Sequence, residues 1–386
     1  MARKIAAAFV ILALAGCSSA PSWNPLDWFA SQPEGAKPAV LTPIAATRSV
    51  RALWTANVGS GDTFVFEPML AGDSVYAAAR DGTVVRIDAA TGQVRWRANA
   101  GARLSAGVGA DARVVVVATD EGEVIALEAQ NGAPRWRTRV SSEVLARPVV
   151  GDDLVVVRSA DSRVFAFNAA DGKRRWVYQR AASSLSVRMP AGVTLHEGFV
   201  FGGFPGGKLI ALTTNTGALR WEVTVALPKG ATELERVTDV VGEPAMQRRE
   251  VCVGAFQGRI ACYEWQSGTQ QWARDISTLT GVSIDAGHAY LSDQSGAVHA
   301  FDRSDGRSVW KQDRLANRRL TLPRPLGAEI AIGDLEGFVH FLSRDSGAFV
   351  ARIATDGSPM RAAPIAIPGG LLVQTRNGGL FALGLQ

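Results

Sequence analysis

The side chains that could do chemistry are few and scattered. The chain of 386 residues has three cysteines and four histidines, which is little material for a metal site. No Ser/His/Asp arrangement, nucleotide-binding loop or paired-carboxylate motif is identifiable. His299 and His340 occupy a position that apolar residues fill in other copies of a repeat described below, which indicates core histidines rather than ligands. We therefore predict no catalytic residue, no metal and no cofactor.

Cys252 and Cys262 flank a turn at Gln257-Gly258, one on each predicted strand. If the turn has two residues, the two side chains face opposite sides of the sheet and cannot bond. If it has three, they share a face and a disulfide can form. Both alternatives stay open, and we favour two buried free thiols.

The third cysteine, Cys17, follows a targeting sequence. Arg3 and Lys4 precede an uncharged apolar run that ends in Leu14-Ala15-Gly16. The run is shorter than the ~20 residues of a membrane-spanning helix. It matches the bacterial lipoprotein signal, in which diacylglycerol alkylates the thiol, the peptide is cut before the cysteine and the new amine is acylated. We predict a signal peptide over residues 1–16 and lipidation of Cys17; an ordinary secretory signal is the alternative.

Residues 17–48 are predicted to be a flexible tether that starts at the lipidated cysteine. Five prolines lie between residues 18 and 48 without a clear periodicity. Ser18, rather than Asp, follows the cysteine, and in bacteria that resemble the well-known Gram-negative ones this choice directs a lipoprotein to the outer membrane. The formal charge of +5 falls to +3 without Arg3 and Lys4, too little to indicate nucleic-acid binding.

A repeat of about 40 residues fills the rest of the chain. Each copy begins with a tight turn at its first position, usually a glycine, and a short apolar run follows. A second glycine lies ten residues after the first position, and a tryptophan lies fourteen residues after the first position. The first positions are Gly82, Gly122, Ser162, Gly207, Gly258, Gly296 and Gly337. Ala351 replaces the tryptophan in the last copy.

Two further apolar strands precede each turn, so that every copy supplies four antiparallel strands, as in a β-propeller blade. Residues 378–383 look like the third strand of an eighth copy, but no tryptophan-bearing fourth strand follows them. Residues 50–54 look like that missing fourth strand. We therefore predict an all-β fold over residues 49–386. It is an eight-bladed β-propeller of four-stranded antiparallel blades, its ring closed by the N-terminal strand joining the last blade.

The repeat resembles the pyrroloquinoline-quinone-type propeller repeat, and Ile87-Asp88, Thr91-Gly92 and Trp96 form the closest copy. The resemblance implies that the tryptophans dock neighbouring blades. It also raises a quinone-dependent dehydrogenase as an alternative function. Such enzymes typically carry adjacent cysteines and acidic calcium ligands, and this chain has no Cys-Cys pair.

Function is expected where the repeat is broken. Tryptophan spacings lie between 38 and 42 residues except for two adjacent ones of 45 and 51, which end at Trp221 and Trp272. The extra residues are predicted to emerge on one face of neighbouring blades. They bring apolar, basic and acidic side chains together, as a protein-binding patch would: Leu185, Val187, Arg188, Arg236 and Asp239. Loop packing with internal ion pairs is the alternative.

The signal, the eight blades and the two loops together resemble the BamB family, the propeller lipoproteins of the outer-membrane β-barrel assembly machinery. In that family a Leu-x-Leu-Arg motif and an Asp-x-Asp motif contribute to docking on the POTRA domains of BamA. Leu185, Val187 and Arg188 match the first motif, with Val for the second Leu. Asp239 matches the first Asp of the second motif, and we expect it to orient Arg188 or to meet the partner directly. Val241 stands where the second Asp is expected.

The resemblance implies a non-enzymatic scaffold, lipid-anchored on the periplasmic face of the outer membrane, that assists insertion of β-barrel proteins. Its implied partners are the POTRA domains of BamA, other Bam subunits and nascent outer-membrane proteins. A quinone-dependent dehydrogenase and a lipoprotein that binds peptides or cell-wall material remain the alternatives.

Replacing the thiol tests the anchor. In Cys17→Ser no acceptor remains for the diacylglycerol, so the chain should stay uncut or become soluble. Mass spectrometry of the wild-type N-terminus should find a multiply acylated residue 17. An unmodified mature terminus at that residue would contradict lipidation.

Overall fold

The computed structural model describes residues 37–181 and 185–386. The predicted signal peptide, Cys17 and most of the predicted tether lie outside the described residues. Within the described ranges no helix is long and apolar enough to cross a membrane.

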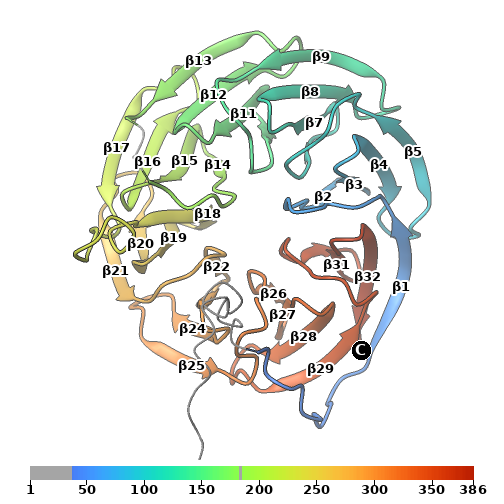
Figure 1. Ribbon diagram of the computed structural model, residues 1–386, viewed down its shortest axis with the longest axis vertical. Helices are drawn as coiled ribbons and strands as arrows, with labels where there is room; N and C mark the ends of the chain where they lie inside the picture. Colours follow the sequence, from blue (N-terminus) through green and yellow to red (C-terminus); the bar gives the residue numbers. More distant parts are fainter. Residues whose placement is uncertain (1–36, 182–184) are drawn as a thin grey trace, which may run out of the picture. The chain divides into compact units, whose positions relative to one another are not determined.

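The described part of the chain forms eight four-stranded antiparallel sheets, set around a central axis as blades (Figure 1). The prediction of an eight-bladed propeller is confirmed. Blade 1 contains β2 (Met69–Ala71), β3 (Ser74–Ala78), β4 (Thr83–Asp88) and β5 (Val94–Asn99). Blade 2 contains β6 (Gly109–Ala110), β7 (Val114–Ala118), β8 (Glu123–Glu128) and β9 (Pro134–Arg139). Blade 3 contains β10 (Val149–Gly151), β11 (Leu154–Ser159), β12 (Arg163–Asn168) and β13 (Arg174–Gln179). Blade 4 contains β14 (Val193–His196), β15 (Phe199–Phe204), β16 (Lys208–Thr213) and β17 (Leu219–Thr224).

The second half of the ring repeats the same order from the axis outward. Blade 5 contains β18 (Asp239–Gln247), β19 (Glu250–Phe256), β20 (Arg259–Glu264) and β21 (Gln270–Asp275). Blade 6 contains β22 (Ser283–Ile284), β23 (His288–Ser292), β24 (Val298–Asp302) and β25 (Ser308–Gln312). Blade 7 contains β26 (Arg324–Leu326), β27 (Glu329–Gly333), β28 (Phe338–Ser343) and β29 (Phe349–Ala354). Blade 8 contains β30 (Ile365–Ile367), β31 (Gly370–Gln374), β32 (Gly379–Leu385) and, outermost, β1 (Val50–Asn57).

The middle strands of each blade are covered on both faces, which explains their continuous apolar runs. Every residue of β7 is buried, for example. The outermost strands alternate between half-buried and exposed residues, as in β5, because only one of their faces meets a neighbouring blade. The core is therefore divided among the blade-to-blade interfaces.

Tryptophans on the outermost strands of seven blades dock each of these blades on the next one around the ring. The indole N–H of Trp96 donates to the Ala129 carbonyl of blade 2 at 3.0 Å. The same ring covers Gly132, whose φ of +74° would strain any other residue and where an added Cβ would meet the ring at 2.8 Å. Equivalent indole donors, at 2.6–3.0 Å from a carbonyl of the next blade, are Trp54, Trp136, Trp176, Trp221, Trp272 and Trp310.

The two ends of the propeller meet in blade 8. Strand β1 pairs with β32 along its whole length, and Ser49 and Gln386 exchange backbone hydrogen bonds of 3.1 and 2.9 Å. Trp54 then donates to the Ala89 carbonyl of blade 1 at 3.0 Å. Strand β1 therefore both completes the last sheet and attaches it to the first blade, as expected.

The cysteines depart from our expectation, because Cys252 and Cys262 form a disulfide. They lie directly opposite each other in the pairing of β19 with β20. The partners are ten residues apart, so the hairpin turn contains an odd number of residues. That is the three-residue alternative, which places both side chains on one face of the sheet.

Residues 38–48 are not a tether, although the sequence suggested one. The Ala39 N–H donates to the Ala316 carbonyl at 2.9 Å, and Arg318 Nη1 donates to the Ala39 carbonyl at 2.8 Å. The Thr47 N–H donates to the Val350 carbonyl at 3.0 Å. The propeller unit therefore begins at Pro38, eleven residues before the predicted boundary at 49.

The two repeat-position histidines lie in the blades, where Nε2 of His340 is 2.9 Å from the fully buried Asp334. Its Nδ1 accepts a hydrogen bond of 3.1 Å from Arg352, so the Nε2–H donates to Asp334. His299 makes the equivalent 2.9 Å contact with Asp293 in blade 6. Each histidine therefore bonds to an aspartate in a turn of its own blade.

Ring closure has a measurable consequence. Deleting residues 49–56 together with everything before them should expose the edge of β32 and remove Trp54. Loss of one buried tryptophan alone costs roughly 3–5 kcal/mol of unfolding free energy. A matched truncation that begins at residue 49 removes residues 1–48 but keeps β1, and it should melt at a higher temperature. If a chain that begins at residue 60 melts like the full propeller, β1 does not close the ring.

Candidate partner-binding site

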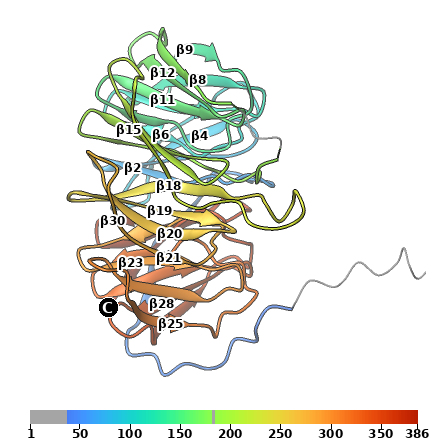
Figure 2. The ribbon, with the colours of Figure 1, turned by 90° about the vertical axis from the view of Figure 1, so that its left-hand side faces the viewer.

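Two long connections lie next to each other on one side of the ring. One joins β13 to β14 across residues 180–192, and the other joins β17 to β18 across residues 225–238. Both run from the outermost strand of a blade to the innermost strand of the next, so they emerge on the same side. Leu185, Leu227 and Leu234 on these loops are 42%, 68% and 73% exposed, and the loop before β18 projects beyond the blades (Figure 2).

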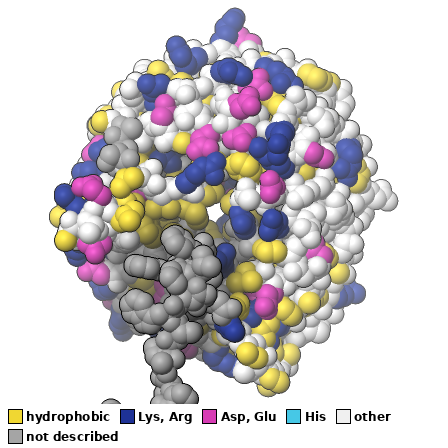
Figure 3. Space-filling view, in the orientation of Figure 1, with side chains coloured by type: hydrophobic (Ala, Val, Ile, Leu, Met, Phe, Trp, Pro, Cys, Tyr) yellow, Lys and Arg dark blue, Asp and Glu magenta, His cyan; other side chains and the backbone are white. Residues whose placement is uncertain are grey.

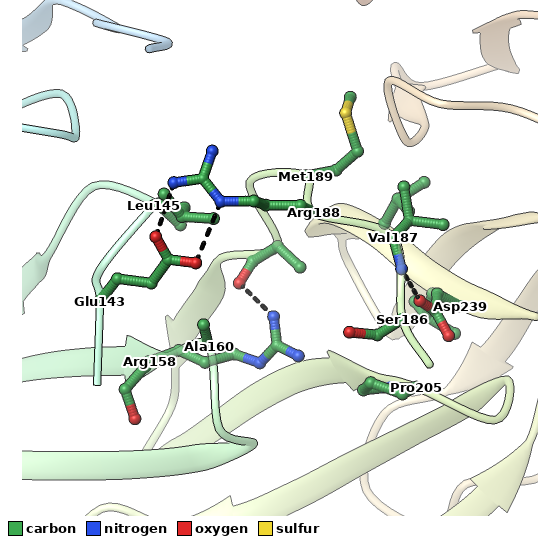
Figure 4. A pocket seen from close by; sticks show the side chains of 15 residues that line it. Glu143, Leu145, Arg158, Ala160, Ser186, Val187, Arg188, Met189, Pro205 and Asp239 are labelled. Atoms are coloured by element: carbon green, nitrogen blue, oxygen red, sulfur yellow. Dashed lines mark hydrogen bonds and ion pairs between the residues drawn. The ribbon is translucent and has the colours of Figure 1, made fainter. Parts of the chain in front are cut away.

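A buried carboxylate joins the two loops. Asp239, the first residue of β18, is 5% exposed and accepts a hydrogen bond of 2.6 Å from the backbone N–H of Val187. Burial raises the pKa of Asp239 above its usual value. Asp239 forms no bond with the Arg188 side chain in the described structure; its carboxylate instead holds the backbone of the first loop at the neighbouring residue (Figure 4). That Asp239 meets a partner directly stays a prediction.

Arg188 instead pairs with Glu143 of the connection between blades 2 and 3. Its Nη2 and Nε lie 2.6 and 3.1 Å from the two carboxylate oxygens, and these hydrogen bonds raise the pKa of Arg188. The Arg188 side chain is still 61% exposed. It lies over the ring of Phe64, 5.7 Å from the centroid. The guanidinium is therefore held in one orientation at the surface with its Nη1 available to a partner.

A cavity of about 230 Å³ lies beneath this ion pair, between blades 3 and 4. Figure 4 shows the side chain of Arg158 entering it from β11. Arg158 Nη1 donates to the Ala191 carbonyl at 2.8 Å. The mouth is formed by Glu143, Leu145 and the loop residues Ser186–Met189.

Of the other predicted residues, Arg236 does not line this cavity, whereas Val241 does. Arg236 is exposed on the loop before β18, where its backbone N–H donates to Thr232. Val241 is 3% exposed and pairs with Gly254 inside blade 5. A second motif aspartate at this position would be buried in the sheet, so its absence removes no surface charge.

Sequence reasoning missed several residues of this surface. Glu143 carried no signal, because a single acidic residue in a connecting loop is common. Leu227 and Leu234 lay inside the long spacing and could have been singled out as large apolar residues in a polar loop. Arg158 had the strongest signal, as a charged residue at a repeat position that is small in most blades.

The central channel is a second opening, and Lys and Arg side chains stand at its rim (Figure 3). Its cavity of about 420 Å³ is crossed by an ion pair of 2.7 Å between Arg147 and Glu243. Arg147 also lies 3.6 Å from Glu67, whose pKa is raised by burial. Among the described residues no group of three or more His, Cys, Asp or Glu side chains could hold a metal ion, so they do not offer the acidic ligand set expected for calcium.

Comparison with known proteins identifies the family. A family model described as "Outer membrane protein assembly factor BamB" matches residues 80–312. The chain is 46% identical over 371 residues to the outer membrane protein assembly factor BamB of Bordetella pertussis, covering 96% of this chain and 94% of that protein. The chain belongs to the BamB family. The crystal structure of BamB from Moraxella catarrhalis matches with a TM-score of 0.78 at 27% identity, over 87% of this chain and 100% of that chain.

The likeness to dehydrogenases is one of fold alone. The quinohemoprotein alcohol dehydrogenase from Comamonas testosteroni matches with a TM-score of 0.70 but only 13% identity, over 86% of this chain and 76% of that chain. Membership of the BamB family confirms the prediction of a non-enzymatic protein over a quinone-dependent dehydrogenase.

The Asp239–Val187 bond predicts how the first loop depends on the second. In Asp239→Asn an amide oxygen can still accept from Val187, and the neutral side chain is tolerated because burial already disfavours the charge. In Asp239→Ala the N–H loses its partner, at a cost of about 1–3 kcal/mol. Hydrogen exchange at residues 185–189 should therefore accelerate in the Ala variant and not in the Asn variant. If residues 185–189 exchange at the same rate in the Ala and Asn variants, Asp239 does not position this loop.

Proposed function

We propose that this protein is a scaffold subunit of the outer-membrane β-barrel assembly machinery that binds the POTRA domains of BamA through the loops 185–189 and 225–238. The observation that carries the proposal is the cross-link between these loops. Asp239 fixes the loop that bears Arg188, so the apolar and charged side chains are presented as one preformed surface. Preformed surfaces lose less conformational entropy on binding. Family membership supports the proposal, since the relatives are named as outer membrane protein assembly factors.

The composition of this surface suits a folded protein partner. Exposed leucines supply apolar area, and the fixed guanidinium of Arg188 can pair with a carboxylate or with backbone carbonyls. Large exposed apolar side chains beside an oriented arginine are typical of interface hot spots. Other subunits of the complex and nascent outer-membrane proteins would contact the remaining faces of the ring.

The location follows from the sequence. The name of the relatives implies association with the outer membrane. Acylated Cys17 would hold the protein on the periplasmic face, and several acyl chains on one residue anchor more firmly than a single chain. The segment between Cys17 and Pro38 would then set the reach of the propeller from the membrane.

Truncating the surface residues tests the proposal. Leu185→Ala combined with Arg188→Ala should abolish capture of BamA in a pull-down, because hot-spot truncations commonly cost about 2 kcal/mol or more each. The thermal melt should stay in place, since both side chains are exposed and an exposed ion pair contributes about 0–1 kcal/mol.

A matched control is available on the outer rim of blade 6. Val309 is 40% exposed and the Arg307 side chain 74% exposed, so Arg307→Ala with Val309→Ala removes the same kinds of side chain elsewhere. This variant should capture BamA normally. If the Leu185/Arg188 variant captures BamA normally, the binding surface lies elsewhere. If that variant unfolds, the two residues have a structural role.

A further inference from the structure

Arg158 is an exception to its own repeat. It lies at the position of the second strand that pairs with Val164 of the third strand. The equivalent residues of six other blades are small: Ala78, Ala118, Gly203, Gly254, Ser292 and Gly333. A Cβ added to Gly203 would approach Val240 of the next blade to 2.3 Å, so close packing of blades favours a small residue here. The fold of a blade therefore does not need this arginine.

Arg158 lies next to the long connection between blades 3 and 4, residues 180–192. In blade 8 the equivalent residue is Gln374, whose amide donates to the Ala78 carbonyl of blade 1 at 3.0 Å, so it bridges two blades directly. Arg158 instead enters the cavity between blades 3 and 4 and bonds to the Ala191 carbonyl of the long loop.

The positive charge of Arg158 is not matched by a bonded carboxylate. Among the described residues no acidic side chain forms an ion pair or hydrogen bond with it, and its Nε is buried without a hydrogen-bond partner. The charge of Asp239 acts on it only through space, and burial lowers the pKa of Arg158 to about 10. A buried charge is costly unless it is paired. The guanidinium lies over the ring of Phe204, 4.8 Å from its centroid, and this cation–π contact leaves the charge without a bonded anion among the described residues.

The surroundings indicate what that partner is. Arg188 and Glu143 at the mouth already pair with each other, and the Asp239 carboxylate already accepts the Val187 N–H. Leu145, Val187 and Met189 add apolar contacts to the lining, and Ser159 and Ser186 add hydroxyl groups. A cavity of about 230 Å³ that holds a guanidinium and is lined by both apolar and hydroxyl side chains fits one carboxylate side chain of a partner protein.

We propose that Arg158 forms a binding pocket for an acidic side chain of the partner, an Asp or Glu on the POTRA surface that docks over the loops. The proposal rests on the proposed function and adds a specific pocket to it. The guanidinium engages the carboxylate with the donors that the Ala191 bond leaves over. Pairing inside the cavity then fixes the orientation of the partner on the ring.

A double-mutant cycle tests the pocket by calorimetry with the isolated POTRA region of BamA from the same bacterium. Arg158→Ala, which installs the residue of blades 1 and 2, should weaken binding about thirtyfold or more, as loss of one partner of a buried charge pair does. Neutralising the surface Asp and Glu residues of the POTRA region one at a time should reveal one carboxylate whose loss weakens binding similarly. That change should add nothing further when combined with Arg158→Ala.

Controls separate this pocket from folding and from the proposed function. Gln374→Ala removes the only other large polar side chain at this repeat position within the described blades and should leave binding unchanged. Arg158→Met keeps the side-chain length without the charge and should bind as weakly as Arg158→Ala while melting within a few degrees of wild type. If either variant fails to fold, the POTRA-side changes still report on the pocket, because they leave this chain intact.

The outcomes are distinct. Binding by wild type and by Arg158→Ala within about twofold of each other overturns the pocket and leaves the proposed function standing. The same holds if no POTRA carboxylate is coupled to Arg158. Failure of the wild-type chain to bind the POTRA region overturns both.

Discussion

The propeller depends on one contact that is repeated around the ring, the indole of an outer-strand tryptophan over a glycine turn of the next blade. The indole and the glycine turn depend on each other. The glycine adopts a left-handed φ and has no side chain, which leaves space above the turn. The indole fills that space and donates a hydrogen bond to a carbonyl of the next blade. Blades are otherwise joined mainly by non-directional apolar packing. The tryptophan therefore sets the angle and height at which each blade meets the next, and with them the positions of the connecting loops.

The single departure from this contact has a structural reason. Blade 7 carries Ala351 where the other docking strands carry tryptophan. In blade 8 the third strand, β32, and the fourth, β1, come from opposite parts of the chain, so no Thr-Gly turn connects them. A tryptophan at position 351 would have no glycine to cover. The missing side chain and the missing turn are two consequences of closing the ring between the chain ends.

Much of this architecture could be predicted because the signals are periodic. Seven copies with the same spacing predict seven blades and, with the incomplete copy at residues 378–383, an eighth. The unpaired strand that carries Trp54 predicts how the ring closes. Features without a period escaped prediction. The disulfide depends on the parity of one hairpin turn, and residues 38–48 bind through backbone groups that any sequence offers. Likewise, Leu185, Arg188 and Asp239 were predicted to lie on neighbouring loops, but the contacts of Arg188 and Asp239 depend on Glu143 and Val187, which only the three-dimensional arrangement brings within reach.

The site arises where the regular packing is relaxed. Where a short connection joins two blades there is room only for a small residue at this position, as at Gly254, where an added Cβ would meet Thr278 at 2.5 Å. The long connection after β13 carries Val187 and Arg188 over the gap between blades 3 and 4, and the space beneath it admits Arg158. Blades held rigidly by tryptophan docking can support such an opening without losing their own core. The ring thus supplies the stability, and a local interruption of its packing supplies a charged cavity that a partner can complete.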